Sequence, residues 1–145
     1  MASIAASLNL TVNNTVLIVM HREIDRIGIV LTLGSAGINS EQAANAADAL
    51  AKIETGQFAA VVLDCELPMT DIFECTKAIR MNETNTHKRL PIIAMSIWDG
   101  LRHTCLAADM DAFLDKASSA ELLKQTICHY TGSALDSGEA SYSGF

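Results

Sequence analysis

The chain has 145 residues, 50% of them hydrophobic and 19% charged, which suits a single domain with its own core and excludes disorder for the bulk of the chain. The formal net charge is −7 at pH 7, with 10 Lys and Arg against 17 Asp and Glu, and no basic cluster offers the face that nucleic-acid binding needs. No apolar run reaches the roughly 18 to 20 residues that cross a bilayer, so the sequence predicts no contact with nucleic acid or membrane.

The cysteine pattern and the start of the chain both favour a reducing compartment. Cys65, Cys75, Cys105 and Cys128 form no CxxC pair, so neither a zinc site nor a thioredoxin-type motif is indicated. Free cysteines usually lie in cores, and we expect these four to be buried and reduced. No basic residue precedes the first apolar stretch, so no secretory signal is indicated. The sequence therefore predicts a cytoplasmic protein.

The two ends of the chain differ from its middle. Residues 1–14 contain no charged residue and end in Asn13 and Asn14, and we expect a linker or a loosely attached tail there. Residues 131–145 are rich in Ser and Gly and have no apolar periodicity, which predicts a flexible tail. We expect one domain over residues 15–130.

Apolar runs and helical patterns alternate along this domain. The first half holds a buried strand at 16–20, a helix at 23–33, a weak strand candidate at 38–42 and a helix from the cap Asn45 to about 55. The second half holds a strand at 59–63, a helix from the cap Asp71 to about 81, a polar loop at 82–89, a strand at 91–96, a helix around 101–108, a short strand at 112–114 and a helix to about 130. This alternation predicts an α/β fold with an open, doubly wound, five-stranded parallel sheet.

In such a sheet the functional side chains lie where the strands end. The crevice that binds ligands lies at the carboxyl ends of the strands, near the switch in strand order. The residues that end or follow the predicted strands are Met20, His21, Asp64, Ser96 and Lys116. We expect the site among these residues.

Four motifs, in this order and at these spacings, resemble a response-regulator receiver domain of the CheY-like kind. Residues 16–19 resemble the family's first strand, 64–71 its phosphoacceptor loop, 91–96 its hydroxyl-bearing fourth strand, and 107–116 its fifth strand with a lysine. The resemblance extends from about Val16 to Tyr130 and implies the flavodoxin-like (βα)5 receiver fold. The polar loop ahead of residue 91 is similar to loops of receivers attached to hybrid sensor histidine kinases.

The resemblance also implies a role for individual side chains. In the family, an aspartate accepts a phosphoryl group from a phosphohistidine, while a lysine and a Ser or Thr bind the phosphoryl oxygens. By resemblance, Asp64 is the phosphoacceptor, Lys116 the lysine and Ser96 the hydroxyl, and Phe113 is the aromatic switch. The main-chain carbonyl of Glu66 matches a ligand of the family's Mg²⁺.

The sequence departs from the family where an acidic pair holds that Mg²⁺. The first strand of the family ends in two acids, and the same places here hold Met20 and His21. A thioether and an imidazole are poor ligands for a hard cation. Glu23 is acidic but lies further along, at the start of a helix, so using it requires a rearrangement. We therefore expect no metal and no cofactor, because the ligands that the family uses for Mg²⁺ are missing.

Other cations could take the place of Mg²⁺ beside Asp64. His21 could bind a softer metal together with Asp64, or could itself serve as the cation when protonated. Without a metal, Lys116 is expected to pair with Asp64 and to hold its pKa below the usual range. Asp64→Asn is then expected to destabilise the fold, because Lys116 loses its partner.

The sequence thus predicts an atypical receiver in two-component or phosphorelay signalling, a phosphorylation-impaired module that binds other proteins. The alternative is a working phosphoacceptor that takes phosphate from a phosphohistidine on Asp64. The implied partners are a histidine kinase or a phosphotransfer domain and other signalling proteins, and the sequence leaves a homodimer open. No further nucleophile, base or cofactor motif indicates independent turnover, although the chain can form part of a hybrid histidine kinase.

Overall fold

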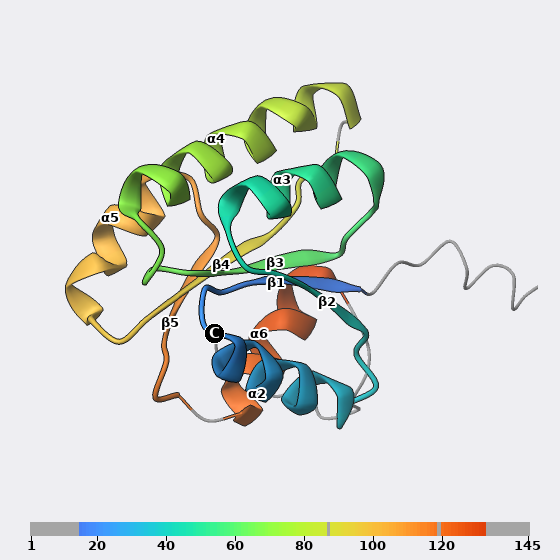
Figure 1. Ribbon diagram of the computed structural model, residues 1–145, viewed down its shortest axis with the longest axis vertical. Helices are drawn as coiled ribbons and strands as arrows, with labels where there is room; N and C mark the ends of the chain where they lie inside the picture. Colours follow the sequence, from blue (N-terminus) through green and yellow to red (C-terminus); the bar gives the residue numbers. More distant parts are fainter. Residues whose placement is uncertain (1–14, 87, 119, 133–145) are drawn as a thin grey trace, which may run out of the picture.

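A five-stranded parallel sheet forms the centre of the protein (Figure 1). The computed structural model describes residues 15–86, 88–118 and 120–132, so the tail predicted at 1–14, and the one predicted at 131–145 from residue 133 onward, lie outside the described residues. The strands are β1 (Val16–Val19), β2 (Ser40–Ala43), β3 (Ala60–Asp64), β4 (Ile92–Ser96) and β5 (Ala112–Asp115). Their order is β2-β1-β3-β4-β5, the doubly wound, flavodoxin-like order, which confirms the predicted fold class.

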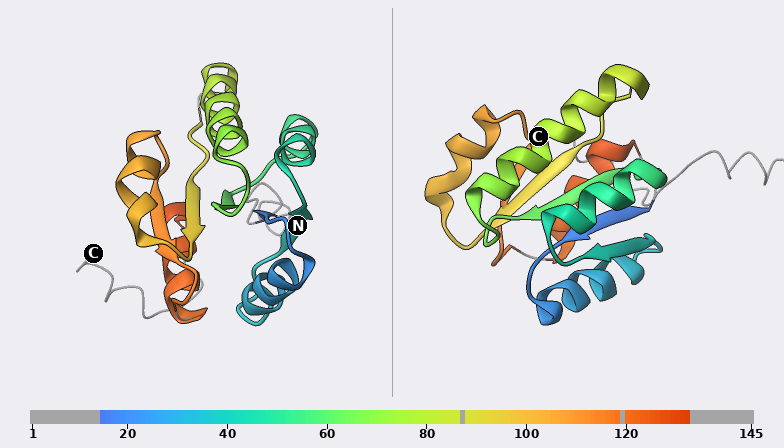
Figure 2. Two further views of the ribbon diagram at one scale, coloured as in Figure 1. Left: turned by 60° about the vertical axis from the view of Figure 1, so that its left-hand side comes forward. Right: turned by 45° about the horizontal axis from the view of Figure 1, so that its top comes forward.

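Helices cover both faces of the sheet, as the two views of Figure 2 show. One face carries α3 (Ala46–Thr55), α4 (Met69–Thr86) and α5 (Arg102–Ala107), the last preceded by the 3-10 turn η1 (Asp99–Leu101). The other face carries α2 (Glu23–Gly34) and α6 (Ala120–Thr131). Because the central strands β1 and β3 are buried on both faces, they read as unbroken apolar runs in the sequence. Among the described residues, no helix has both the length and the hydropathy that a membrane span needs.

Helix α4 is longer than predicted at both ends. It begins at Met69, ahead of the predicted cap, and continues through most of the segment 82–89 that was predicted as a polar loop. Two contacts of Glu83 stabilise this polar turn. Glu83 pairs with Arg80 one turn earlier in the same helix and accepts the main-chain N–H of Leu90, beyond the helix, at 2.6 Å. A polar composition alone is a weak guide where such contacts stabilise the helix.

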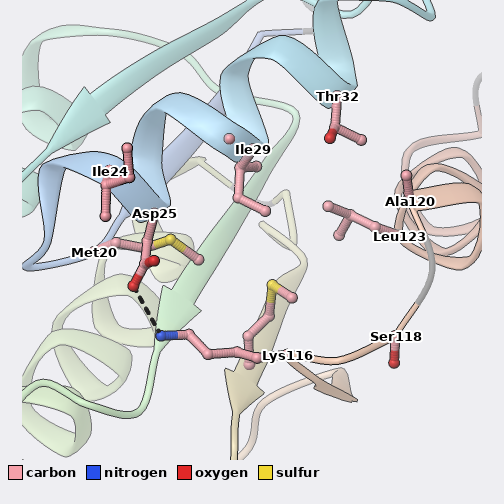
Figure 3. Close-up of a pocket in the computed structure, with 11 residues that line it drawn as sticks. Met20, Ile24, Asp25, Ile29, Thr32, Lys116, Ser118, Ala120 and Leu123 are labelled. Atoms are coloured by element: carbon pink, nitrogen blue, oxygen red, sulfur yellow. Dashed lines mark hydrogen bonds and ion pairs between the residues drawn. The ribbon is translucent and has the colours of Figure 1, made fainter.

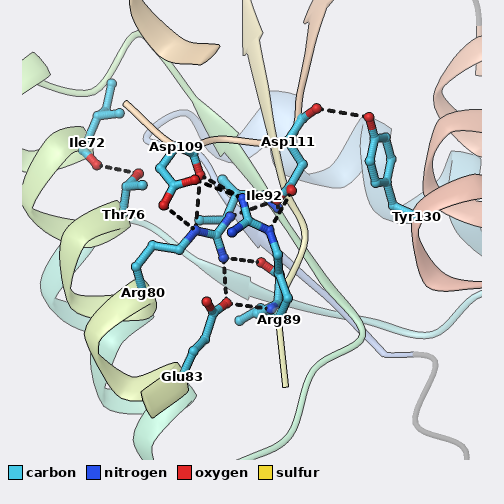
Figure 4. Close-up of polar contacts among 10 residues, drawn as sticks. Ile72, Thr76, Arg80, Glu83, Arg89, Ile92, Asp109, Asp111 and Tyr130 are labelled. Carbon is cyan, nitrogen blue, oxygen red and sulfur yellow. Dashed lines mark hydrogen bonds and ion pairs between the residues drawn. The ribbon is translucent and has the colours of Figure 1, made fainter. Parts of the chain in front are cut away.

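A network of arginines and aspartates joins α4 to the amino end of β5 (Figure 4). Asp111, directly before β5, accepts from Arg80 at 2.7 Å and from Arg89 at 2.9 Å. Arg89 also binds the carboxylate of Asp109 at 3.0 Å. The φ of Asp109 is 79°, a left-handed conformation that aspartate adopts more readily than most residues. The network therefore lies at the amino ends of the strands, opposite the edge where β3 ends at Asp64.

Candidate functional site

The carboxyl edge of the sheet brings together residues from β3, β4 and β5. Asp64 ends β3 and is fully buried. Lys116 directly follows β5, and its Nζ donates to Asp64 Oδ2 at 2.8 Å. Ser96 ends β4, and its carbonyl accepts the main-chain N–H of Lys116 at 2.9 Å. The structure therefore contains the predicted Asp64–Lys116 pair and has Ser96 at the same edge.

Three carboxylates converge at this edge. Asp25 comes from the first turn of α2, Asp64 from the end of β3, and Glu66 from the loop that follows β3. Each can offer an oxygen that lies within 4.8 Å of the oxygens of the other two. Figure 3 shows Lys116 reaching toward Asp25, with Nζ 3.3 Å from Oδ2. Carboxylate oxygens are the ligands that hard divalent cations such as Mg²⁺ prefer, so the donor set fits such a cation.

The prediction that ligands for Mg²⁺ are missing is therefore wrong. The prediction considered only the two positions after β1 and the nearby Glu23. Asp25 lies beyond them, in the first turn of α2, where the helix brings its carboxylate back toward the end of β3. The available signal was helical spacing, because residues three or four apart share one face of a helix. An acid one turn after a strand end can thus reach the site.

Neither Met20 nor His21 belongs to this group of carboxylates. Met20 is buried in the core under α2 and α6, while His21 is exposed. Arg26 of α2 binds both main-chain carbonyls, that of Met20 at 2.8 Å and that of His21 at 3.1 Å, from Nη1. The group of converging acids found within the described ranges contains Asp25 and not His21, so the site differs from the one predicted with His21 as a ligand or cation.

Burial dominates the electrostatics of Asp64. Removal from water raises its pKa, and this outweighs the hydrogen bond from Lys116, the 3.0 Å hydrogen bond from the main-chain N–H of Glu66 and the charge of the lysine. The expected lowering of the Asp64 pKa is wrong for this reason. Burial also acts to lower the pKa of Lys116, but the hydrogen bonds and charges of Asp64 and Glu66 raise it above 10.5, so the ammonium stays charged at neutral pH.

The Ser96 hydroxyl is engaged by the loop that follows it. Its Oγ accepts the main-chain N–H of Trp98 at 2.9 Å and donates to the Trp98 carbonyl at 3.2 Å. Between them, the side chain of Ile97 is 71% exposed, and thus extends into solvent rather than into the core. Phe113 is buried on β5, and the guanidinium of Arg102 lies 4.9 Å above its ring. The ring of Phe113 is therefore in contact with a charged side chain of α5.

Comparisons with known proteins agree on one family. The model of the response regulator receiver domain matches residues 16–128. The hybrid signal transduction protein dokA of Dictyostelium discoideum is 30% identical over 109 residues, which is 75% of this chain and 6% of that protein. The chain spans only 4% to 15% of the length of several curated relatives, among them histidine kinases and sensor kinases.

Solved receiver structures share the fold. The receiver domain of the sensor histidine kinase PA1611 from Pseudomonas aeruginosa, with a magnesium ion coordinated in its active-site cleft, is 28% identical, covers 83% of this chain and 98% of its own, and has a TM-score of 0.72. The receiver domain of Ssk1 from Saccharomyces cerevisiae, crystallised with the histidine phosphotransfer protein Ypd1, is 21% identical, covers 83% of this chain and 90% of its own, and has a TM-score of 0.73. The magnesium ion of the first neighbour agrees with a cation-binding role for this edge of the fold.

Proposed function

Because the chain belongs to the response regulator receiver domain family, we propose that it is a working phosphoacceptor in phosphorelay signalling, in which Asp64 takes a phosphoryl group from a phosphohistidine. The observation that carries this proposal is the convergence of Asp25, Asp64 and Glu66 around Lys116. The sequence instead predicted a phosphorylation-impaired module, with the working phosphoacceptor as the alternative. That prediction depended on missing cation ligands, and Asp25 removes the argument for it.

The carboxylate of Asp64 is held ready to act as the nucleophile. Lys116 donates to Oδ2 and the N–H of Glu66 donates to Oδ1, so both oxygens have fixed partners. In the transfer, a carboxylate oxygen forms a bond to phosphorus while the phosphorus–nitrogen bond to the histidine breaks, and the imidazole leaves with that electron pair. Lys116 is placed to stabilise the phosphoryl oxygens by its charge, and the Ser96 hydroxyl can join it after leaving Trp98.

Asp25, Asp64 and Glu66 are the residues that would hold a divalent cation. When bound, such a cation offsets the negative charge that builds up as a phosphoryl group meets the carboxylates. The magnesium ion in the cleft of the PA1611 receiver domain supports this assignment. The chain's own contribution is to supply three carboxylates, from the first turn of α2, the end of β3 and the loop that follows β3.

We propose a histidine kinase or a histidine phosphotransfer protein as the partner. The relatives that are histidine kinases support this assignment, and Ssk1 provides one receiver domain in complex with a phosphotransfer protein. Since Asp64 is buried, the histidine must approach from the carboxyl edge. Three apolar side chains flank that edge, Ile24 at 68%, Ile97 at 71% and Trp98 at 63% exposure, and contact with a partner would remove them from water.

For the domain, we propose the limits 15–130.

A small phosphodonor tests the proposed function without a partner. The full chain is incubated with phosphoramidate, with and without Mg²⁺, and intact-mass spectrometry counts the added phosphoryl groups. We expect one phosphoryl group per chain in the presence of Mg²⁺, none for Asp64→Asn, and normal labelling for Asp71→Asn, whose carboxylate lies outside the group of converging acids. A wild-type chain that stays unlabelled with Mg²⁺ present contradicts the proposal.

A further inference from the structure

Two cysteine side chains from different elements contact each other next to the end of β3. The Sγ atoms of Cys65 and Cys105 lie 3.6 Å apart. Cys65 directly follows Asp64, and Cys105 belongs to α5. Both side chains lie in the core cluster between the sheet and the face that carries α3, α4 and α5 (Figure 1). The contact therefore joins the residue after the proposed phosphoacceptor to a helix far away in the sequence.

We propose that Cys65 and Cys105 are a redox site, at which a hydroperoxide converts the two thiols into an intramolecular disulfide that fixes α5 to the end of β3. A disulfide has an S–S length of about 2.05 Å, so the two sulfurs, now 3.6 Å apart, must approach by about 1.5 Å. The site uses none of the carboxylates of the proposed cation site, so it can be tested independently of phosphoryl transfer.

The oxidation takes place in two steps, and hydrogen peroxide supplies all that they need. The sulfur of Cys65 attacks one peroxide oxygen, the O–O bond breaks, and the departing hydroxide takes the thiol proton, which leaves a sulfenic acid and water. The sulfur of Cys105 then attacks the sulfur of Cys65, the S–O bond breaks, and the hydroxide takes the second thiol proton and leaves as water. The two thiols together lose two electrons, and the peroxide gains them.

Burial protects the pair in the closed structure. Cys65 is 8% exposed and Cys105 is fully buried, so the peroxide reaches Cys65 first. Burial also raises the pKa of both thiols, which keeps them protonated and slow to react. Oxidation therefore requires a local opening of the structure around the pair.

Helix α5 is suited to such an opening. It has six residues, and its N-cap Leu101 provides no side-chain hydrogen bond, so this short helix depends on its packing against the core. The main-chain N–H of Cys65, in contrast, donates to the carbonyl of Met95 on β4 at 2.8 Å, which attaches Cys65 to the sheet. The movement that brings the sulfurs together is therefore expected in α5, and the disulfide then restrains this helix.

The segment from Ser96 to α5 connects the redox site to the phosphoacceptor, and this step rests on the proposed function. The Ser96 hydroxyl binds the main chain of Trp98, and η1 and α5 follow directly after Trp98. A disulfide that holds α5 restricts this segment, so the hydroxyl leaves Trp98 less readily. We expect phosphorylation by phosphoramidate to change the Trp98 emission severalfold less in the oxidised chain than in the reduced chain.

Counting the free thiols of the full chain tests the redox site. The native chain is treated with hydrogen peroxide and then denatured in the presence of N-ethylmaleimide, and intact-mass spectrometry counts the labelled thiols. The chain has four free cysteines, and we expect the count to fall by two, peptide mapping to join Cys65 to Cys105, and dithiothreitol to restore the full count. An unchanged count after peroxide, or a disulfide that joins other cysteines, refutes the site.

Two variants and a measurement of hydrogen exchange complete the test. Cys105→Ala should form no intramolecular disulfide, whereas Cys75→Ala, which removes a thiol from the same core cluster, should form it as the wild type does. Amide hydrogen exchange in α5 should be slower in the oxidised wild type than in the reduced one, and peroxide should not change it in Cys105→Ala. A Cys65–Cys105 disulfide with unchanged exchange in α5 refutes the restraint on the helix. If the reduced chain is not phosphorylated at all, the proposed function fails, and the thiol count still decides the redox site.

Discussion

Lys116 Nζ and Asp64 Oδ2 lie 2.8 Å apart, and the carboxylate of this pair is fully buried while the lysine also reaches Asp25 and Glu66. The lysine therefore keeps two acidic partners if Asp64 loses its charge. The carboxylate of Asp64, in contrast, is fully removed from water, and this loss of hydration disfavours its charged form. This asymmetry decides how a change at Asp64 affects stability.

We expect Asp64→Asn to increase the free energy of unfolding at pH 7, opposite to the expectation from sequence. Burial raises the pKa of Asp64, so the ionised form weakens the folded state, and asparagine fills the same space without a charge. Urea melts of the two proteins check this outcome. A variant that is less stable than the wild type would mean that the Asp64–Lys116 attraction outweighs the cost of burial.

The pH dependence of the same comparison follows from the direction of the shift. A raised pKa means that the folded protein holds the Asp64 proton more tightly than the unfolded chain does. The stability that this provides is present below the ordinary value of 3.8 and is lost as the pH rises through the folded pKa. The advantage of Asp64→Asn should therefore grow with pH across that window and stay level above it.

Asp25→Asn should weaken Mg²⁺ binding roughly tenfold or more, because it removes a charged ligand, and even residues that only support a metal ligand cost that much. The matched control is Glu23→Gln, which removes an acid from the same first turn of α2 but not from the group of converging carboxylates. Isothermal calorimetry in low-salt buffer measures both. Equal losses in the two variants would indicate a general effect of charge and not a ligand at Asp25.

Ser96 should transmit phosphorylation to Trp98. The Ser96 hydroxyl holds the main chain of Trp98, and a phosphoryl group on Asp64 would attract that hydroxyl. Trp98 is the single tryptophan of the chain, so its fluorescence reports this loop alone. We expect phosphorylation to change the emission in the wild type and to have little further effect in Ser96→Ala. If Asp64 is phosphorylated and the Trp98 emission of the wild type does not change, the prediction that Ser96 transmits phosphorylation to Trp98 is wrong.

Arg80 should matter to stability far more than an exposed ion pair does. Its guanidinium binds Glu83, Asp111 and the carbonyl of Leu90, and its side chain is 11% exposed. Arg80→Ala removes one charged partner from each of two largely buried acids, Glu83 and Asp111, and we expect a loss of about 3 kcal/mol. Lys124→Ala breaks the exposed pair with Glu121 and should cost about 0.5 kcal/mol or less. Similar losses for both variants in urea melts would contradict this ranking.

The features that follow from the pattern of strands could be predicted from the sequence. The apolar runs of β1 and β3 predicted a sheet buried on both faces, and the carboxyl ends of the strands predicted that Asp64, Ser96 and Lys116 would gather at one edge. The position of Asp25 could not be predicted in the same way, because it depends on where the first turn of α2 places this carboxylate relative to the end of β3. The pKa of Asp64 depends on a balance between burial and pairing, and a sequence shows which groups are present but not how deeply each is buried.

Beryllofluoride, which imitates a phosphoryl group on an aspartate, tests the central claim most directly. The full chain is titrated with beryllofluoride with and without Mg²⁺, and NMR spectra report the main-chain amides around Asp64. The account predicts a complex that forms only with Mg²⁺, is lost in Asp25→Asn and persists in Glu23→Gln. Spectra that stay unchanged at every Mg²⁺ concentration would contradict it.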